Sequence, residues 1–201
     1  MKKIIFYFIF LFFSKVNAQC KLEKFTLVRT DTIASENYML VAENGKTKNL
    51  NPTKYIVSLT FHEKAYFAIF SIKGKKGWNA VDFNENILFE VYNTIPNEPW
   101  PDHLIENRIR IVDKNNKIGF ANECGKIVIE PKFDYVSNFN KDYAIIAKNC
   151  PIPKIKESIY SPKSRCKEYG YIDKNGKILK IGNYTYDQIQ KEINWKDIYL
   201  D

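Results

Sequence analysis

Histidine is nearly absent from this sequence of 201 residues, which contains only His62 and His103. Neither lies beside a serine or cysteine in a nucleophile motif. The P-loop, dinucleotide-binding and HExxH patterns are also missing. These absences favour a protein that is not an enzyme and that uses no metal or other cofactor. Both histidines are expected to be ordinary surface residues.

Long hydrophobic runs are missing after the first twenty residues, so no transmembrane segment is expected in the mature chain. The N-terminus has two lysines followed by an apolar run from Ile4 to Phe13, which is shorter than the roughly 20 residues that span a bilayer. Val16 and Ala18 fit the −3 and −1 positions of a signal-peptide cleavage site. We therefore predict a signal peptide over residues 1–18 and an exported protein, either periplasmic or secreted.

Acidic residues are outnumbered 23 to 31 by lysine and arginine, which gives a formal net charge of +8. The lysines are scattered along the chain, a pattern that favours solubility over nucleic-acid binding, so no nucleic-acid partner is expected. Cys20 raises the alternative of a lipoprotein. That alternative is disfavoured because the residue before it, Gln19, is not small.

Alanine is scarce, whereas isoleucine, phenylalanine and tyrosine are frequent, and this composition favours strands. Short polar turns recur along the chain: ENGK at 43–46, NEN at 84–86, ECGK at 123–126 and KNGK at 174–177. The turn residues Gly45, Glu85 and Gly125 follow one another at intervals of 40 positions. Gly176 comes 51 positions later, which indicates an insertion in the last interval.

The segments around these turns also repeat. An apolar strand follows each turn, and then a motif such as FDYV from Phe133 or YDQI from Tyr186. We predict an all-β fold of about four antiparallel three-stranded meanders, stacked as a short open solenoid-like array in a single domain over residues 19–201. Pro131 is expected to end a strand, and the aromatic residue of FDYV to pack between units. Trp100, between two prolines, is either an exposed aromatic for sugar or peptide contact or, as the favoured alternative, another residue packed between units.

Gly-aromatic steps, Gly-Lys turns, apolar strands and the PKFDYV segment together resemble the bacterial WG (KWG) β-repeat family, most clearly over residues 118–148. The family's tryptophan before the glycine is replaced by Lys76, Ile118 and Tyr169, and the 40-residue spacing exceeds its usual unit. The resemblance implies an all-β repeat scaffold. It transfers no catalytic residues, because the family shares none.

Two of the four cysteines border the insertion. Cys150 follows the strand YAIIAKN and Cys166 precedes KEYGYID, and the repeat makes these strands hairpin partners. We predict a Cys150–Cys166 disulfide that closes an insertion at 150–166 and contributes about 3 kcal/mol in the chain-entropy model. Cys20 and Cys124 either pair with each other or leave a free thiol. A metal site is disfavoured because nearby histidines and C-x-x-C spacing are absent.

The loop inside this insertion is basic and partly apolar, so it either binds a partner or folds back over the sheet. The candidate partner-binding residues are Lys154, Lys156, Ile159, Tyr160, Lys163 and Arg165. The expected function is that of an exported, non-enzymatic binding or scaffold protein of the bacterial cell envelope, with a protein or glycan of the envelope as partner. The alternatives are an envelope hydrolase that uses carboxylates from separate repeats, and a secreted effector.

Overall fold

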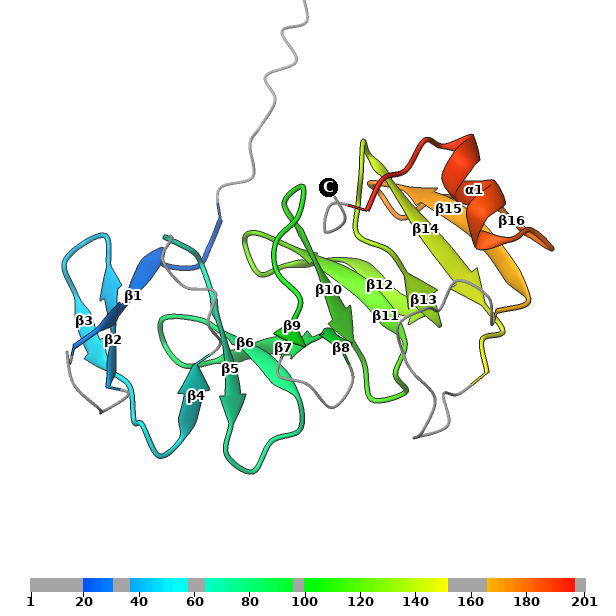
Figure 1. Cartoon of the computed structure of the whole chain (residues 1–201). Coiled ribbons are helices and arrows are strands. Elements are labelled where there is room, and N and C mark those ends of the chain that lie inside the picture. Colours follow the sequence, from blue (N-terminus) through cyan, green and yellow to red (C-terminus); the bar gives the residue numbers. More distant parts are fainter. Residues whose placement is uncertain (1–19, 31–36, 58–63, 96–99, 152–165, 198–201) are drawn as a thin grey trace, which may run out of the picture.

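The chain folds into successive antiparallel meanders that follow one another in a row (Figure 1). The computed structural model describes residues 20–30, 37–57, 64–95, 100–151 and 166–197. Four units contain three strands each: β1 (Phe25–Arg29), β2 (Tyr38–Ala42) and β3 (Thr47–Asn49); β5 (Ala68–Ile72), β6 (Trp78–Val81) and β7 (Ile87–Val91); β10 (Arg108–Val112), β11 (Ile118–Asn122) and β12 (Ile127–Phe133); β14 (Tyr143–Lys148), β15 (Glu168–Asp173) and β16 (Ile178–Gly182). The predicted all-β repeat fold is confirmed.

Among the described residues, four short strands lie between the units: β4 (Tyr55–Val57), β8 (Asn93–Ile95), β9 (Trp100–Pro101) and β13 (Tyr135–Val136). Strands β4 and β13 each extend the edge of a neighbouring unit's sheet, and β8 pairs with β9 in a separate two-stranded sheet. Because β7 also pairs with β10, with Val91 opposite Ile111, the second and third units share one seven-stranded sheet. The first unit forms its own sheet, and β13 joins the fourth. In the part of the chain that the structure describes, no helix has the length and apolar character needed to cross a membrane.

The hydrophobic core is divided into layers between neighbouring units. In β14, Ala144 and Ile146 face the core shared with the third unit, whereas Ile145 and Ala147 face the opposite layer. Successive side chains of a strand point to opposite faces, so a sheet buried on both faces needs a continuous apolar run. This explains the sequence YAIIA and why a single meander depends on its neighbours for burial.

In the second, third and fourth units, the turn between the second and third strands packs on the third strand of the preceding unit. The contacting pairs are Glu85 with Lys48, Gly125 with Leu88, and Gly176 with Ile129. All of these turn residues have positive φ, as does Gly45 in the first unit. Among the described residues, a Cβ atom at Gly45 would meet nothing within 4 Å.

Pro131 does not end its strand, contrary to the prediction, because β12 continues through it to Phe133. The register between β11 and β12 shifts between Ile118 and Phe120, which accommodates the proline in a bulge on an edge strand. Here the third strand approaches Gly119 so closely that a Cβ atom would lie 2.6 Å from the Pro131 nitrogen. The glycine of the Gly-aromatic step therefore makes room for the neighbouring backbone.

The last unit ends in a helix that the repeat pattern did not predict, α1 (Tyr186–Glu192). Thr185 caps it: its hydroxyl accepts from the Gln188 N–H at 3.2 Å, and the Gln188 side chain accepts from the Thr185 N–H at 2.8 Å. The helix buries Tyr186 and Ile189 against the outer face of the last sheet. The aromatic residue of the repeat motif is thus buried, as Phe133 is, but it starts a helix here.

Candidate functional site

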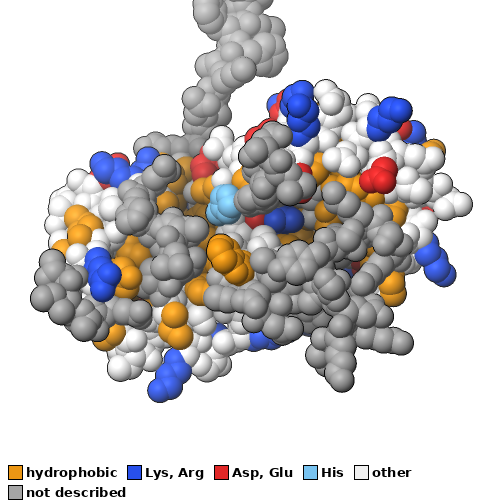
Figure 2. Space-filling model, viewed as in Figure 1, with side chains coloured by type: hydrophobic (Ala, Val, Ile, Leu, Met, Phe, Trp, Pro, Cys, Tyr) orange, Lys and Arg blue, Asp and Glu red, His pale blue; other side chains and the backbone are white. Residues whose placement is uncertain are grey.

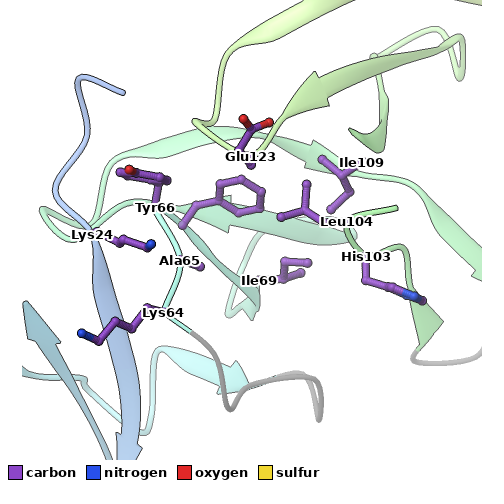
Figure 3. A pocket seen from close by; sticks show the side chains of 10 residues that line it. Lys24, Lys64, Ala65, Tyr66, Ile69, His103, Leu104, Ile109 and Glu123 are labelled. Atoms are coloured by element: carbon purple, nitrogen blue, oxygen red, sulfur yellow. The ribbon is translucent and has the colours of Figure 1, made fainter. Parts of the chain in front are cut away.

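A cavity of about 450 Å³ opens where four distant segments meet (Figure 3). The first segment precedes β1, the second leads into β5, the third lies between β9 and β10, and the fourth is the turn between β11 and β12. The lining residues are Lys24, Lys64, Ala65, Tyr66, Phe67, Ile69, His103, Leu104, Ile109 and Glu123. The repeat therefore forms a concave site from residues that are far apart in the sequence.

The floor of the cavity is apolar and belongs to the core between the second and third units. Phe67, Ile69 and Ile109 are all buried in this layer. Phe67 also packs edge-on against Phe89, with ring centroids 5.5 Å apart. The floor is thus part of a packed core layer, and largely apolar linings of this kind are usual for small-molecule sites.

The rim carries charges of both signs. The Lys24 ammonium lies 5.6 Å from the centre of the Tyr66 ring, a cation–π contact, and Lys24 is half-buried. Lys64 is exposed and pairs with Glu43 at 3.6 Å. In Figure 3, Glu123 stands across the cavity from these lysines, and the imidazole of His103 is directed outward.

The segment that carries His103 and Leu104 is held by a buried ion pair. Asp102 accepts from Arg110 Nη2 at 2.8 Å, and both side chains are almost inaccessible to solvent. Burial alone would lower the pKa of Arg110, but the adjacent Asp102 carboxylate raises it above its usual value. The guanidinium therefore remains charged and fixes the wall of the cavity next to Asp102.

The N-terminal segment is fastened beside the cavity by a disulfide between Cys20 and Cys124, whose Cα atoms are 5.1 Å apart. Cys124 directly follows the lining residue Glu123, so this bond joins the segment before β1 to the turn of the third unit. It decides between the two alternatives that the sequence left open for these cysteines.

The structure also pairs Cys150 with Cys166, as predicted, with their Cα atoms 4.0 Å apart. The Cys150 N–H donates to Asp134 at 3.3 Å, and the Cys166 N–H donates to the Tyr169 hydroxyl at 3.2 Å. The predicted partner-binding residues all lie outside the described residues: Lys154, Lys156, Ile159, Tyr160, Lys163 and Arg165. His62 lies outside them as well.

Trp100 does not pack between units as predicted. It lies in the β8–β9 hairpin and is 57% exposed, and the nearby Leu104 is exposed as well. Figure 2 shows hydrophobic side chains reaching the surface near the middle of this face, with most Lys and Arg side chains toward its edges. Two prolines next to a tryptophan thus indicated a surface feature here and not a core residue.

Sequence reasoning did not find the cavity, because no local pattern links its four segments. The signal in the sequence was only indirect: Glu123 lies in a repeat turn, and His103 lies in the segment that follows Trp100. Among the described residues, no group of three or more His, Cys, Asp or Glu side chains is arranged to hold a metal ion. Chemically, the cavity offers an apolar surface with a half-buried ammonium at its edge.

Comparisons with known proteins support the repeat and add no named relative. The searches of curated proteins and of solved structures return no match. Residues 118–149, which contain the second and third strands of the third unit, β13 and the first strand of the fourth unit, match the family model described as the WG containing repeat. The resemblance predicted from the sequence is thereby confirmed: the clearest unit of this chain is similar to the WG containing repeat.

Proposed function

We propose that the protein is an exported, non-enzymatic binding protein of the bacterial cell envelope and that the cavity between its second and third units holds the ligand. The observation that carries this proposal is the cavity itself, with its buried apolar floor and charged rim. Its volume of about 450 Å³ falls within the range of roughly 300–1,000 Å³ that is usual for small-molecule sites.

Export is supported by two features of the chain. The first is the signal-peptide pattern of residues 1–18. The second is the use of all four cysteines in disulfides, which persist in oxidising compartments. Fractionation of the producing cells and mass measurement of the mature chain test this part. We expect an N-terminus at Gln19, no attached lipid, and recovery outside the cytoplasm.

Binding fits the cavity better than hydrolysis does. A hydrolase of the two-carboxylate type needs a facing pair of acids about 5–10 Å apart. Glu123 is the one carboxylate among the described residues that line the cavity. The site therefore resembles a preformed pocket for a ligand more than a pair of acid and base groups. The basic loop at 152–165 remains a second predicted contact surface on the same protein.

Native mass spectrometry of the mature protein, after incubation with an envelope extract, tests the binding role. Ala65→Trp would fill the cavity, whereas Ile56→Trp places the same indole ring at an exposed position of β4. We expect the wild type and the Ile56→Trp variant to retain a ligand that the Ala65→Trp variant loses. A ligand retained equally by all three proteins, but lost when residues 151–165 are shortened, would place the function in the loop instead.

A further inference from the structure

We propose that the cavity selects a small hydrophobic carboxylate, whose apolar body lies on the floor and whose carboxylate meets Lys24. The inference rests on the proposed function, because it specifies the ligand class of that same cavity. Three features carry it: the apolar floor, the position of Lys24 and the different situation of Lys64.

The floor dictates an apolar ligand body. Phe67, Ile69 and Ile109 present buried aliphatic and aromatic surface, and Tyr66 and Leu104 extend this surface toward the rim. A ligand that covers such a surface gains free energy from the apolar area it removes from water. A fully hydrophilic ligand, such as a sugar without an apolar face, would gain little there.

Lys24 supplies the charge that completes the site. Its side chain extends from the edge of the cavity toward the interior, next to Tyr66 and Ala65 (Figure 3). It is half-buried, and within the described ranges no carboxylate forms an ion pair with it. A ligand carboxylate would supply the missing opposite charge, and such charge-assisted hydrogen bonds are stronger than neutral ones.

Lys64 differs in both respects, which makes it a matched control. Its ammonium points away from the cavity in Figure 3, it is exposed, and Glu43 pairs with it at 3.6 Å. Replacing either lysine with glutamine changes the net charge of the protein equally. The geometry assigns ligand recognition to Lys24 alone, so the two substitutions separate a local contact from a general electrostatic effect.

Two kinds of ligand carry a carboxylate next to an apolar group: a free hydrophobic acid, and a peptide whose C-terminal residue is hydrophobic. Both place a carboxylate at the end of an apolar group. The probes for the free acid are 3-phenylpropanoate and its uncharged amide. The probes for the peptide end are N-acetyl-glycyl-phenylalanine and its C-terminal amide. Each pair keeps the apolar body and removes only the charge.

Calorimetric titration of the mature, disulfide-bonded protein with these probes tests the inference. We expect the acid to bind about tenfold more tightly than its amide, since a charge-assisted contact of this kind is worth about one decade in affinity. The preference should disappear in Lys24→Gln and persist in Lys73→Gln, which removes the same charge at an exposed position outside the cavity lining. Lys64→Gln, at the rim but with its ammonium directed away from the cavity, should retain it as well. It should also shrink in the wild type as salt is raised, a measurement that does not depend on a variant folding.

The outcomes separate this inference from the proposed function. Equal affinity for acid and amide overturns the ligand class while leaving the cavity as a binding site. If the envelope ligand that the Ala65→Trp variant loses proves to be uncharged, the ligand class is likewise overturned and the cavity remains a binding site. The inference is also overturned if neither acid binds with a Kd below about 10 mM, which is weaker than the Kd of about 1 mM that corresponds to roughly 4 kcal/mol of binding free energy. A preference for the peptide pair over the free-acid pair identifies the source as a peptide end.

Discussion

Asp102 accepts three hydrogen bonds from Arg110: from its backbone N–H at 2.8 Å, from Nε at 3.0 Å and from Nη2 at 2.8 Å. The remaining guanidinium nitrogen, Nη1, donates to the Val136 carbonyl at 3.3 Å, in the strand that leads into the fourth unit. The guanidinium also lies 4.9 Å from the centre of the Tyr92 ring. One buried ion pair thus connects the cavity wall, the third unit and the start of the fourth.

Removing one partner of this pair should be strongly destabilising. Asp102→Leu leaves a buried guanidinium without its counter-charge, which typically costs about 3–5 kcal/mol of unfolding free energy. The double variant Asp102→Leu/Arg110→Met removes both charges and should recover a substantial part of that loss. Urea denaturation of the two variants and the wild type provides the comparison.

A surface pair gives the matched control. Lys180 and Glu192 form an ion pair at 2.6 Å whose side chains are both partly exposed to solvent. Glu192→Gln should leave the urea midpoint almost unchanged, because water and salt already screen such a pair. If Asp102→Leu proved as mild as Glu192→Gln, the buried pair would not hold the units together.

Glu85 should make stability depend on acid pH. It accepts from the Tyr55 hydroxyl at 2.7 Å and from Lys54 at 3.0 Å, and it pairs with Lys48 at 3.1 Å. Burial alone would raise the pKa of Glu85, but these contacts outweigh it and lower the pKa from 4.5 to about 2. The carboxylate form is therefore the one that the folded protein stabilises.

Because the folded-state pKa is depressed, the stabilisation is present above pH 4.5 and is lost as pH falls toward 2. With solvent screening taken into account, it amounts to about 1–2 kcal/mol. Glu85→Gln should lower the unfolding free energy at neutral pH, and its curve should converge with that of the wild type near pH 2. Lys48→Gln should give an intermediate curve. Parallel curves for wild type and Glu85→Gln would exclude this linkage.

The repeat turns show how much of the fold was accessible to sequence reasoning. Gly45, Glu85, Gly125 and Gly176 were assigned to turns by their spacing, and each adopts positive φ. The spacing was informative because every unit repeats one local geometry. The residues that each turn contacts could not be predicted, because the contact with the third strand of the preceding unit depends on how the units stack.

Helix α1 was missed for a related reason. The segment from Tyr186 aligns with the motif that starts at Phe133, and this similarity outweighed the local signal of the capping box Thr185–Gln188. In the described residues, the helix covers the face of the fourth sheet that points away from the third unit. The cavity and the exposure of Trp100 likewise depend on contacts between distant segments, which periodicity does not encode.

Substituting the turn glycines with alanine should separate backbone strain from packing. Gly45→Ala places a Cβ atom in open space at a φ of 83°, so its cost is the strain of that conformation, about 1–2 kcal/mol. At Gly125, where φ is 72°, a Cβ atom would also lie 2.7 Å from Leu88 Cδ1. We expect Gly125→Ala to be the more destabilising in thermal unfolding, with Gly176→Ala between the two. Equal losses would show that the stacking contacts adjust freely.

The two disulfides should differ in what they contribute to stability. The Cys20–Cys124 bond spans 104 positions and encloses the first two units and the first two strands of the third, whereas the Cys150–Cys166 bond spans 16. In the chain-entropy model a loop of about 100 residues contributes roughly 4.7 kcal/mol and one of about 15 residues roughly 3 kcal/mol. The longer bond therefore restricts the unfolded chain more.

Guanidinium denaturation of paired serine variants checks this difference. Cys20→Ser/Cys124→Ser should lose about 1–2 kcal/mol more unfolding free energy than Cys150→Ser/Cys166→Ser. The first pair should also weaken ligand binding in the cavity, because Cys124 adjoins Glu123 and Cys20 fastens the segment that carries Lys24. The second pair lies in the fourth unit and should leave that binding unchanged. Equal binding by both variants would mean that the segment before β1 keeps its position through its other contacts, such as the bridge between Phe25 and Ala65.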